Sequence, residues 1–183
     1  MGSTEARTGE GNWVEGEIGA EKATGYSFYR SVLGSPRYVV APMVDASELA
    51  WRILSRYYGA ELCYTPMIHA GLFADDRQTK YRAEQLDLAA GEEGLPGLDR
   101  PLIVQFCANN PDTLLAAAHL VLTHHDNPGA LPPVDAVDLN LGCPQGIAKK
   151  GKYGAFLMDH LDLISQLSTY TSVHHNLSAS SCS

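Results

Sequence analysis

The chain has 183 residues, of which 45% are hydrophobic and 19% are charged, and its net charge at neutral pH is −8. This size and composition fit one soluble globular domain with a hydrophobic core. The chain has no apolar run of the ~18 residues that a membrane span needs, and its acidic balance argues against a protein whose whole surface binds nucleic acid.

Predicted strands recur along the chain after an acidic, glycine-rich N-terminus. In that N-terminus no basic segment precedes an apolar stretch, so it does not resemble a secretory signal, and we expect residues 1–25 to be disordered. Short apolar runs bounded by turn residues then predict four buried strands. These runs span residues 37–41, 61–65, 101–106 and 135–141.

Helical patterns separate the predicted strands. In residues 46–60 apolar side chains recur at helical spacing, and Asp45 and Ser47 are candidate N-caps. Residues 110–125 give the clearest helix in the sequence, and a further helix is expected over about 153–167. Because strands alternate with helices, the sequence predicts parallel βαβ units.

Four such units amount to half of a (β/α)8 TIM barrel, which usually has about 250 residues. We therefore predict an α/β fold in which residues 26–167 form the N-terminal half of a barrel. Residues 84–100 are acidic and glycine-rich and are interpreted as an insertion loop. The serine-rich residues 168–183 lack periodicity and are expected to form an irregular tail.

Unusual residues stand at the ends of all four predicted strands, where a parallel barrel places its active site. The sequences at these ends are APM, TPMIHAG, QF and NLGCPQG. Cys143, between Gly142 and Pro144, belongs to the last of them. A free thiol has a pKa of about 8.5, so it can serve as an acid at neutral pH, or as a nucleophile beside a base. A small buried hydrophobe is the other interpretation of Cys143, and the preferred one for Cys63 and Cys107.

Two amides and a strand-end pair admit two interpretations each. Gln105 and Asn140 lie on predicted strands, where they are either satisfied core amides or groups that recognise the amide edge of a planar ring. Pro42 and Met43 either end a strand and fill the core, or pack on a flat cofactor ring. The residues alone leave these alternatives open.

One dense basic cluster stands out from the acidic chain, and it comprises Lys149, Lys150 and Lys152. It is either a solvated loop or a local phosphate-binding group. The cysteines and histidines have no zinc-ligand spacing, and the cysteines form no C-x-x-C pair. We therefore predict no metal site and no disulfide framework, and a reducing intracellular setting.

Taken together, these residues resemble the tRNA-dihydrouridine synthase family. That family shows an APM strand end, a glutamine on the third strand, an LNxGCP motif, a lysine- and glycine-rich loop and a G-A-x-L helix start. The segments APMVDASELAWR, CYTPMIHA, RPLIVQFCAN and DLNLGCPQGIAKKGKYGAFL are most similar to the eukaryotic members that act on uridines 16 and 17 of the tRNA D-loop.

The resemblance implies a TIM-barrel oxidoreductase with FMN as cofactor, NADPH or NADH as reductant and tRNA as partner, located in the cytoplasm and also in the nucleus. The reduced flavin would pass a hydride to C6 of a uracil, and Cys143 would protonate C5. Four residues match flavin-contacting positions, namely Pro42, Met43, Val44 and Gln105. Asn140 would line the same pocket, and the three lysines would lie close to RNA phosphates.

The matching sequence ends near residue 167. In the family, the second half of the barrel supplies a flavin-binding lysine, a histidine and the FMN phosphate site, so we expect a C-terminally truncated member. Its open strand edges and uncovered apolar interior favour self-association. One alternative is a catalytically inactive interaction fragment. Another is a flavin barrel acting on a free pyrimidine, such as a dihydroorotate dehydrogenase, which the LNLGCPQ segment and the lysine-rich loop disfavour.

Overall fold

The computed structural model describes residues 25–88, 92–123 and 132–178. Its centre is a sheet of parallel strands. The strands are β1 (Val39–Val40), β2 (Leu62–Tyr64), β3 (Ile68–His69), β4 (Leu102–Cys107) and β5 (Ala136–Leu139). The parallel sheet with helical crossovers confirms the expected α/β class and the partial barrel. All but one residue of the segment expected to be disordered, 1–25, lie outside the described ranges.

The strands β2 and β3 are two parts of one line along the same side of β4. Cys63 pairs with Leu102 in the first part and Ile68 pairs with Phe106 in the second, while β5 occupies the opposite side of β4. The break falls at Pro66, which has no N–H for the ladder. The buried Thr65 hydroxyl there accepts a hydrogen bond from Gln105 N at 3.2 Å. The interruption therefore leaves the β4 backbone paired.

Helices cover one face of this sheet. Helix α2 (Leu49–Tyr57) precedes β2, and three elements follow β3, namely α3 (Ala70–Ala74), η1 (Asp76–Gln78) and α4 (Thr79–Gln85). Helix α5 (Pro111–Leu122) follows β4. Three elements follow β5, namely α6 (Gly146–Gly151), η2 (Gly154–Leu157) and α7 (Leu161–Ser178). Helix α5 packs against both α3 and α7. The main core lies between these helices and the sheet, where Val104 and Phe106 are fully buried.

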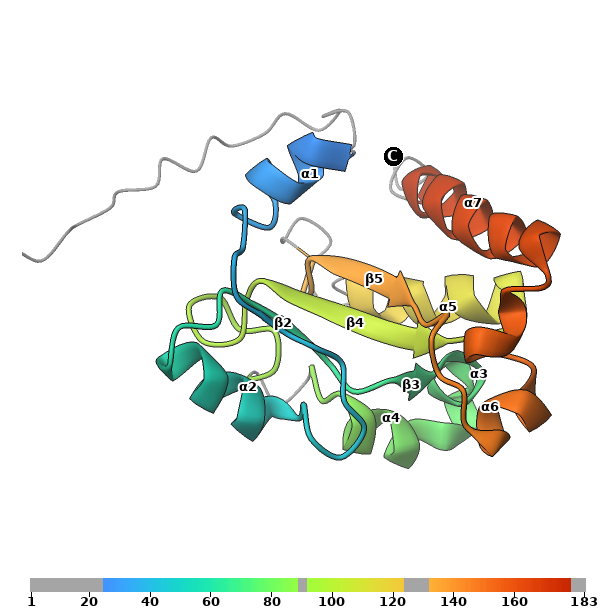
Figure 1. The fold of residues 1–183 in the computed structure, drawn as a ribbon, viewed down its shortest axis with the longest axis horizontal. Coiled ribbons are helices and arrows are strands. Elements are labelled where there is room, and N and C mark those ends of the chain that lie inside the picture. Colours follow the sequence, from blue (N-terminus) through green and yellow to red (C-terminus); the bar gives the residue numbers. More distant parts are fainter. Residues whose placement is uncertain (1–24, 89–91, 124–131, 179–183) are drawn as a thin grey trace, which may run out of the picture.

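The inner face of the sheet is the one opposite to these helices. Figure 1 shows α1 (Gly25–Ser31) across the sheet from α2 and α4. A second, smaller cluster forms there from Leu33, Leu62 and Ile103, with Phe28 of α1 packed against it. Alternation along the strands then places Gln105 and Asp138 on the same inner face, beyond this cluster. The helix α1 thus covers the beginnings of the strands and leaves their ends to the candidate site.

The C-terminal part differs from the expectation. Instead of an irregular segment from residue 168, the structure continues α7 to Ser178. Leu167 is fully buried and anchors the helix, and no glycine or proline interrupts residues 161–178. Once the first turns are packed, each further residue adds a hydrogen bond at little cost, so a polar sequence can extend the helix. Residues 179–183 lie outside the described ranges.

Candidate functional site

The strand ends of the sheet bring Gln105, Asn140 and Cys143 together. Gln105 Nε2 donates a hydrogen bond to Asp138 Oδ2 at 2.7 Å, and Asn140 Nδ2 donates to Gln105 Oε1 at 3.0 Å. These bonds fix which way both amides face. Each amide has a second N–H hydrogen that no bond within the described residues engages, so each can donate to a planar ring beside the inner face.

Asn140 also holds the turn that carries the thiol. Its Oδ1 accepts hydrogen bonds from the backbone N–H groups of Gly142, at 3.2 Å, and Cys143, at 3.0 Å. The backbone N–H of Asn140 donates to Phe106 O at 2.8 Å, and this bond connects Asn140 to β4. A single asparagine therefore links the end of the sheet to the position of Cys143, as side-chain turns of this kind commonly do.

The segment after α6 packs directly on Cys143. Ala155 N donates to Cys143 O at 3.0 Å. Gly154 has φ +64°, and a Cβ at this position would lie 2.6 Å from Cys143 O. Only glycine accepts both this backbone conformation and this approach without strain. The glycine of the G-A-x-L pattern is thus required by the contact with the cysteine turn.

Two side chains near this turn, Cys107 and Tyr153, stay protonated because burial raises the pKa of each. Burial raises the pKa of the Cys107 thiol to about 12, and the Tyr153 side chain hydrogen-bonds to that thiol. Burial also raises the pKa of Tyr153 above its ordinary value. Cys63 and Cys107 are buried, whereas Cys143 is half-buried. Of the three cysteines in the described ranges, Cys143 is therefore the one that a reactant can reach.

His69 has a structural role that the sequence did not suggest. Its Nδ1 accepts a hydrogen bond from Leu72 N at 3.2 Å, which caps the N-terminus of α3. Its ring lies edge-to-face against Tyr153, with ring centroids 5.8 Å apart. The structure therefore uses His69 to begin a helix, and its capping bond occupies the nitrogen that a base would need.

The loop after β1 presents apolar side chains. Pro42 is half-buried, while Met43 and Val44 are 37% and 60% exposed. Ser47 closes this loop, since its Oγ accepts from Met43 N at 2.9 Å and donates to Met43 O at 3.0 Å. The expectation that Asp45 or Ser47 is the N-cap of α2 was wrong. That position is Glu48, whose side chain makes no capping bond.

These groups fit an FMN ring on chemical grounds. Exposed methionine and valine side chains at one strand end can pack on its flat apolar surface. The amides of Gln105 and Asn140 can donate to its polar edge. The Met43 loop and these amides lie at the carboxyl ends of parallel strands, and within the described ranges no hydrogen bond joins them.

The three lysines are exposed, and within the described residues none forms an ion pair. Lys149 and Lys150 lie in the last turn of α6, and Lys152 follows with φ +54°. Asn109 Nδ2 donates to Gly151 O at 2.8 Å, which fixes this lysine loop beside the end of β4. Lysines held in this way can contact an anionic backbone next to the Cys143 turn.

Asp138 belongs to the candidate site through its bond to Gln105, and the sequence analysis missed it. It lies two residues before Asn140 on β5, so both side chains face the same side of the sheet. A carboxylate on a predicted buried strand needs a hydrogen-bond donor, and that requirement was the available signal.

In the described residues, no group of three metal-ligating side chains is close enough to hold an ion, and no helix is long and apolar enough to cross a membrane.

Comparison with known proteins finds a family match along most of the chain. The family model for dihydrouridine synthases matches residues 39–177, which extends ten residues beyond the end that we expected near 167. The chain is 55% identical over 157 residues to the tRNA-dihydrouridine(16/17) synthase of Saccharomyces cerevisiae, covering 86% of this chain and 33% of the yeast protein.

Two mammalian relatives are also similar over most of this chain, and their names carry different tRNA positions. A rat protein named tRNA-dihydrouridine(16/17) synthase-like is 51% identical and covers 80% of this chain, and a human tRNA-dihydrouridine(20a/20b) synthase-like protein is 39% identical and covers 70%. The names of all three relatives include NAD(P). The chain spans about a third of the length of these curated relatives. The chain belongs to the dihydrouridine synthase family.

Proposed function

We propose that this chain carries the proton donor and one wall of the flavin site of a tRNA-dihydrouridine synthase. The reaction is the reduction of uridine to 5,6-dihydrouridine at positions 16 and 17 of the tRNA D-loop, with NADPH or NADH as reductant. The observation that carries the proposal is the bonded series Gln105–Asn140–Cys143, which puts an accessible thiol beside two oriented amides. Family membership and the names of the relatives support the substrate and the reductant.

The chain contributes an acid to this reaction. FMN, when bound, supplies the hydride that adds to C6 of the uracil. Cys143 gives its thiol proton to C5, so the C5–C6 double bond gains one hydride and one proton. The thiolate that results regains a proton from solvent, which the half-buried position of Cys143 allows. The target base has to leave its stack to reach this turn.

The remaining candidate residues position the two reactants. Met43 and Val44, together with Pro42, pack against the flavin ring, and Gln105 and Asn140 donate hydrogen bonds to it. The lysines of the α6 turn, Lys149, Lys150 and Lys152, contact RNA phosphates close to the extruded base. Because base-independent phosphate contacts fix register, they would set which D-loop uridine reaches Cys143.

A flavin-retention experiment tests the proposal. The chain is mixed with FMN, desalted, and its visible spectrum is recorded before and after anaerobic addition of NADPH. Because the family's FMN phosphate site lies outside the matched sequence, we expect weak binding, seen as a partly retained flavin band that bleaches. With unmodified tRNA, Cys143→Ala should lower dihydrouridine formation at least 100-fold, as loss of a general acid typically does, and leave flavin retention unchanged. Cys63→Ala is the control, since it removes a thiol that the site does not use.

Two results would contradict the proposal. One is a folded sample of the parent chain that retains no FMN. The other is a Cys143→Ala chain that forms dihydrouridine as fast as the parent. The first would place the flavin site outside this chain, and the second would assign the proton to another donor.

A further inference from the structure

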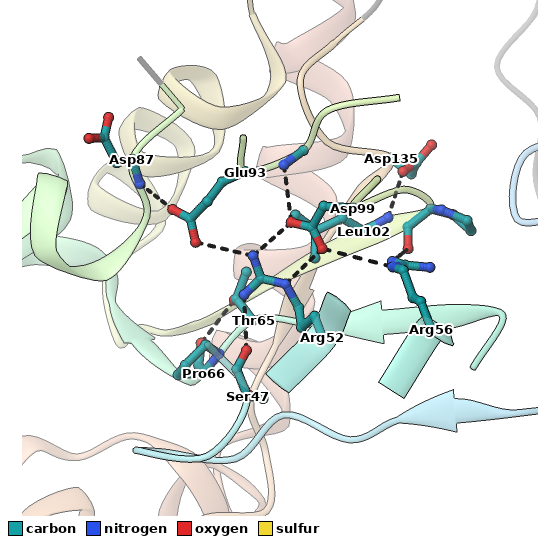
Figure 2. Close-up of polar contacts among 12 residues, drawn as sticks. Ser47, Arg52, Arg56, Thr65, Pro66, Asp87, Glu93, Asp99, Leu102 and Asp135 are labelled. Carbon is teal, nitrogen blue, oxygen red and sulfur yellow. Dashed lines mark hydrogen bonds and ion pairs between the residues drawn. The ribbon is translucent and has the colours of Figure 1, made fainter. Parts of the chain in front are cut away.

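A buried guanidinium connects α2 to the segment before β4 (Figure 2). Arg52 is only 1% exposed. Its Nε donates to Asp99 Oδ1 at 2.9 Å and its Nη2 donates to Asp99 Oδ2 at 2.7 Å, which makes a two-pronged pair with a fully buried carboxylate. Nη2 also donates to Glu93 Oε1 at 3.1 Å. Such a pair has a fixed geometry because the guanidinium and the carboxylate must align for both hydrogen bonds to form at once.

Both carboxylates belong to the segment 84–100 that the sequence analysis interpreted as an insertion loop. In the structure, residues 92–99 of this segment fold around Arg52. Asp99 Oδ2 also accepts from Gly94 N at 3.1 Å, and the second oxygen of Glu93 accepts from Asp87 N. Each carboxylate therefore bonds its own segment as well as the guanidinium, so the segment and the helix keep one relative position.

The guanidinium also reaches the loop after β1. Arg52 Nη1 donates to Ser47 O at 2.9 Å, and Ser47 is fully buried. Ser47 in turn bonds the backbone of Met43 through both its hydroxyl donor and its acceptor. Figure 2 shows the part of this series of bonds from Asp99 through Arg52 to Ser47. The bonds of the Ser47 hydroxyl continue it to the Met43 backbone.

We infer that Arg52 is a positioning residue for the loop 42–47, and that the segment 92–99 sets the geometry of this loop through it. The part of the inference that concerns flavin rests on the proposed function. A buried cation with several partners cannot shift without leaving a charge unpaired, so its contacts are held rigidly. A loop held in this way presents Met43 and Val44 to a flat ring with little ordering left to do, which favours binding.

The test compares the same substitution at two neighbouring arginines. Arg52→Lys keeps a cation beside Asp99 but has no second arm for Ser47 O. Arg100→Lys is the matched control, because Arg100 makes a similar two-pronged pair with Asp135 and donates to the Pro132 carbonyl, away from the loop. Site-resolved amide hydrogen exchange of Met43 and Ser47 reports on the loop, and FMN titration reports on the site.

In Arg52→Lys we expect both amides to exchange at least tenfold faster and the Kd for FMN to rise at least tenfold. In Arg100→Lys both quantities should stay within twofold of the parent. Unchanged amide exchange in folded Arg52→Lys, or equal acceleration in Arg100→Lys, overturns the inference. If Arg52→Lys does not fold, Glu93→Gln replaces it. In Glu93→Gln, amide exchange of Met43 and Ser47 that is at least threefold faster than in the parent supports the inference, and unchanged amide exchange overturns it. If the parent binds no FMN, the proposed function fails for this chain, while amide exchange still decides the role of Arg52.

Discussion

Asp138 decides how two amides of the candidate site face, because an amide rotated by 180° exchanges its donor and its acceptor. The carboxylate can only accept, so it selects the orientation in which Gln105 Nε2 faces it. That choice leaves Gln105 Oε1 for Asn140 Nδ2, which in turn leaves Asn140 Oδ1 for the Cys143 turn. One carboxylate therefore determines the hydrogen-bond direction along the whole series.

Removal of this carboxylate should loosen the cysteine turn. In Asp138→Ala we expect faster hydrogen exchange at the Cys143 amide and a loss of about 1.5–3 kcal/mol of unfolding free energy, as for hydrogen bonds to a charged group. Asp138→Asn keeps an acceptor for Gln105 and should recover most of both quantities. Urea unfolding and amide exchange measure them. If alanine and asparagine behaved alike, acceptance by this side chain would not set the amide direction.

The three cysteines of the described ranges should differ in reactivity. In a Cys182→Ser background, iodoacetamide is expected to modify Cys143 first, because Cys63 and Cys107 are buried. A rise from pH 7 to pH 9 increases the thiolate fraction of any thiol. Cys107, with a pKa of about 12, would still be only about one part in a thousand thiolate at pH 9. Peptide mass spectrometry measures the order of labelling, and early labelling of Cys107 would contradict the buried arrangement.

Among the elements, η2 depends on a glycine at its first position. In Gly154→Ala the new Cβ would meet Cys143 O in a backbone conformation that alanine disfavours. We expect a loss of more than about 1 kcal/mol in unfolding free energy, with faster exchange of the Ala155 amide. Gly146→Ala is the control, because Gly146 begins α6 with nothing within 4 Å of an added Cβ. That change should be neutral or slightly stabilising.

The strand ends could be predicted from the sequence because each buried strand is a short apolar run that stops at a proline, an amide or a glycine. The break between β2 and β3 could not, since only the tertiary structure brings the Thr65 hydroxyl, which lies at the break, within reach of Gln105 N on β4. Arg52 was also beyond prediction. An arginine in a helix is usually exposed, and only the tertiary approach of Asp99 makes its burial possible. The C-terminal end of α7 was also beyond prediction, because its polar sequence contains no residue that marks where the helix stops.

At the scale of the whole molecule, the sheet ends on β1 at one side and on β5 at the other. A groove of about 500 Å3 runs beside β1, and its lining includes Val39, Trp51 and Leu54. These three side chains are 47–50% exposed. Exposed apolar side chains next to an unpaired parallel strand are a common basis for association between chains.

We predict that the 183-residue chain self-associates through this groove. We predict that sedimentation velocity will show a mass above the 19.8 kDa of the monomer, increasing with concentration. Leu54→Glu puts a charge into the groove and should restore the monomer, because burial of an unpaired carboxylate opposes association. Leu161→Glu is the matched control, since Leu161 is 71% exposed on α7, outside the groove. If both changes gave monomers, general surface charge would be the cause. If neither did, the opposite edge at β5 would be the contact, because it is the other unpaired side of the described sheet.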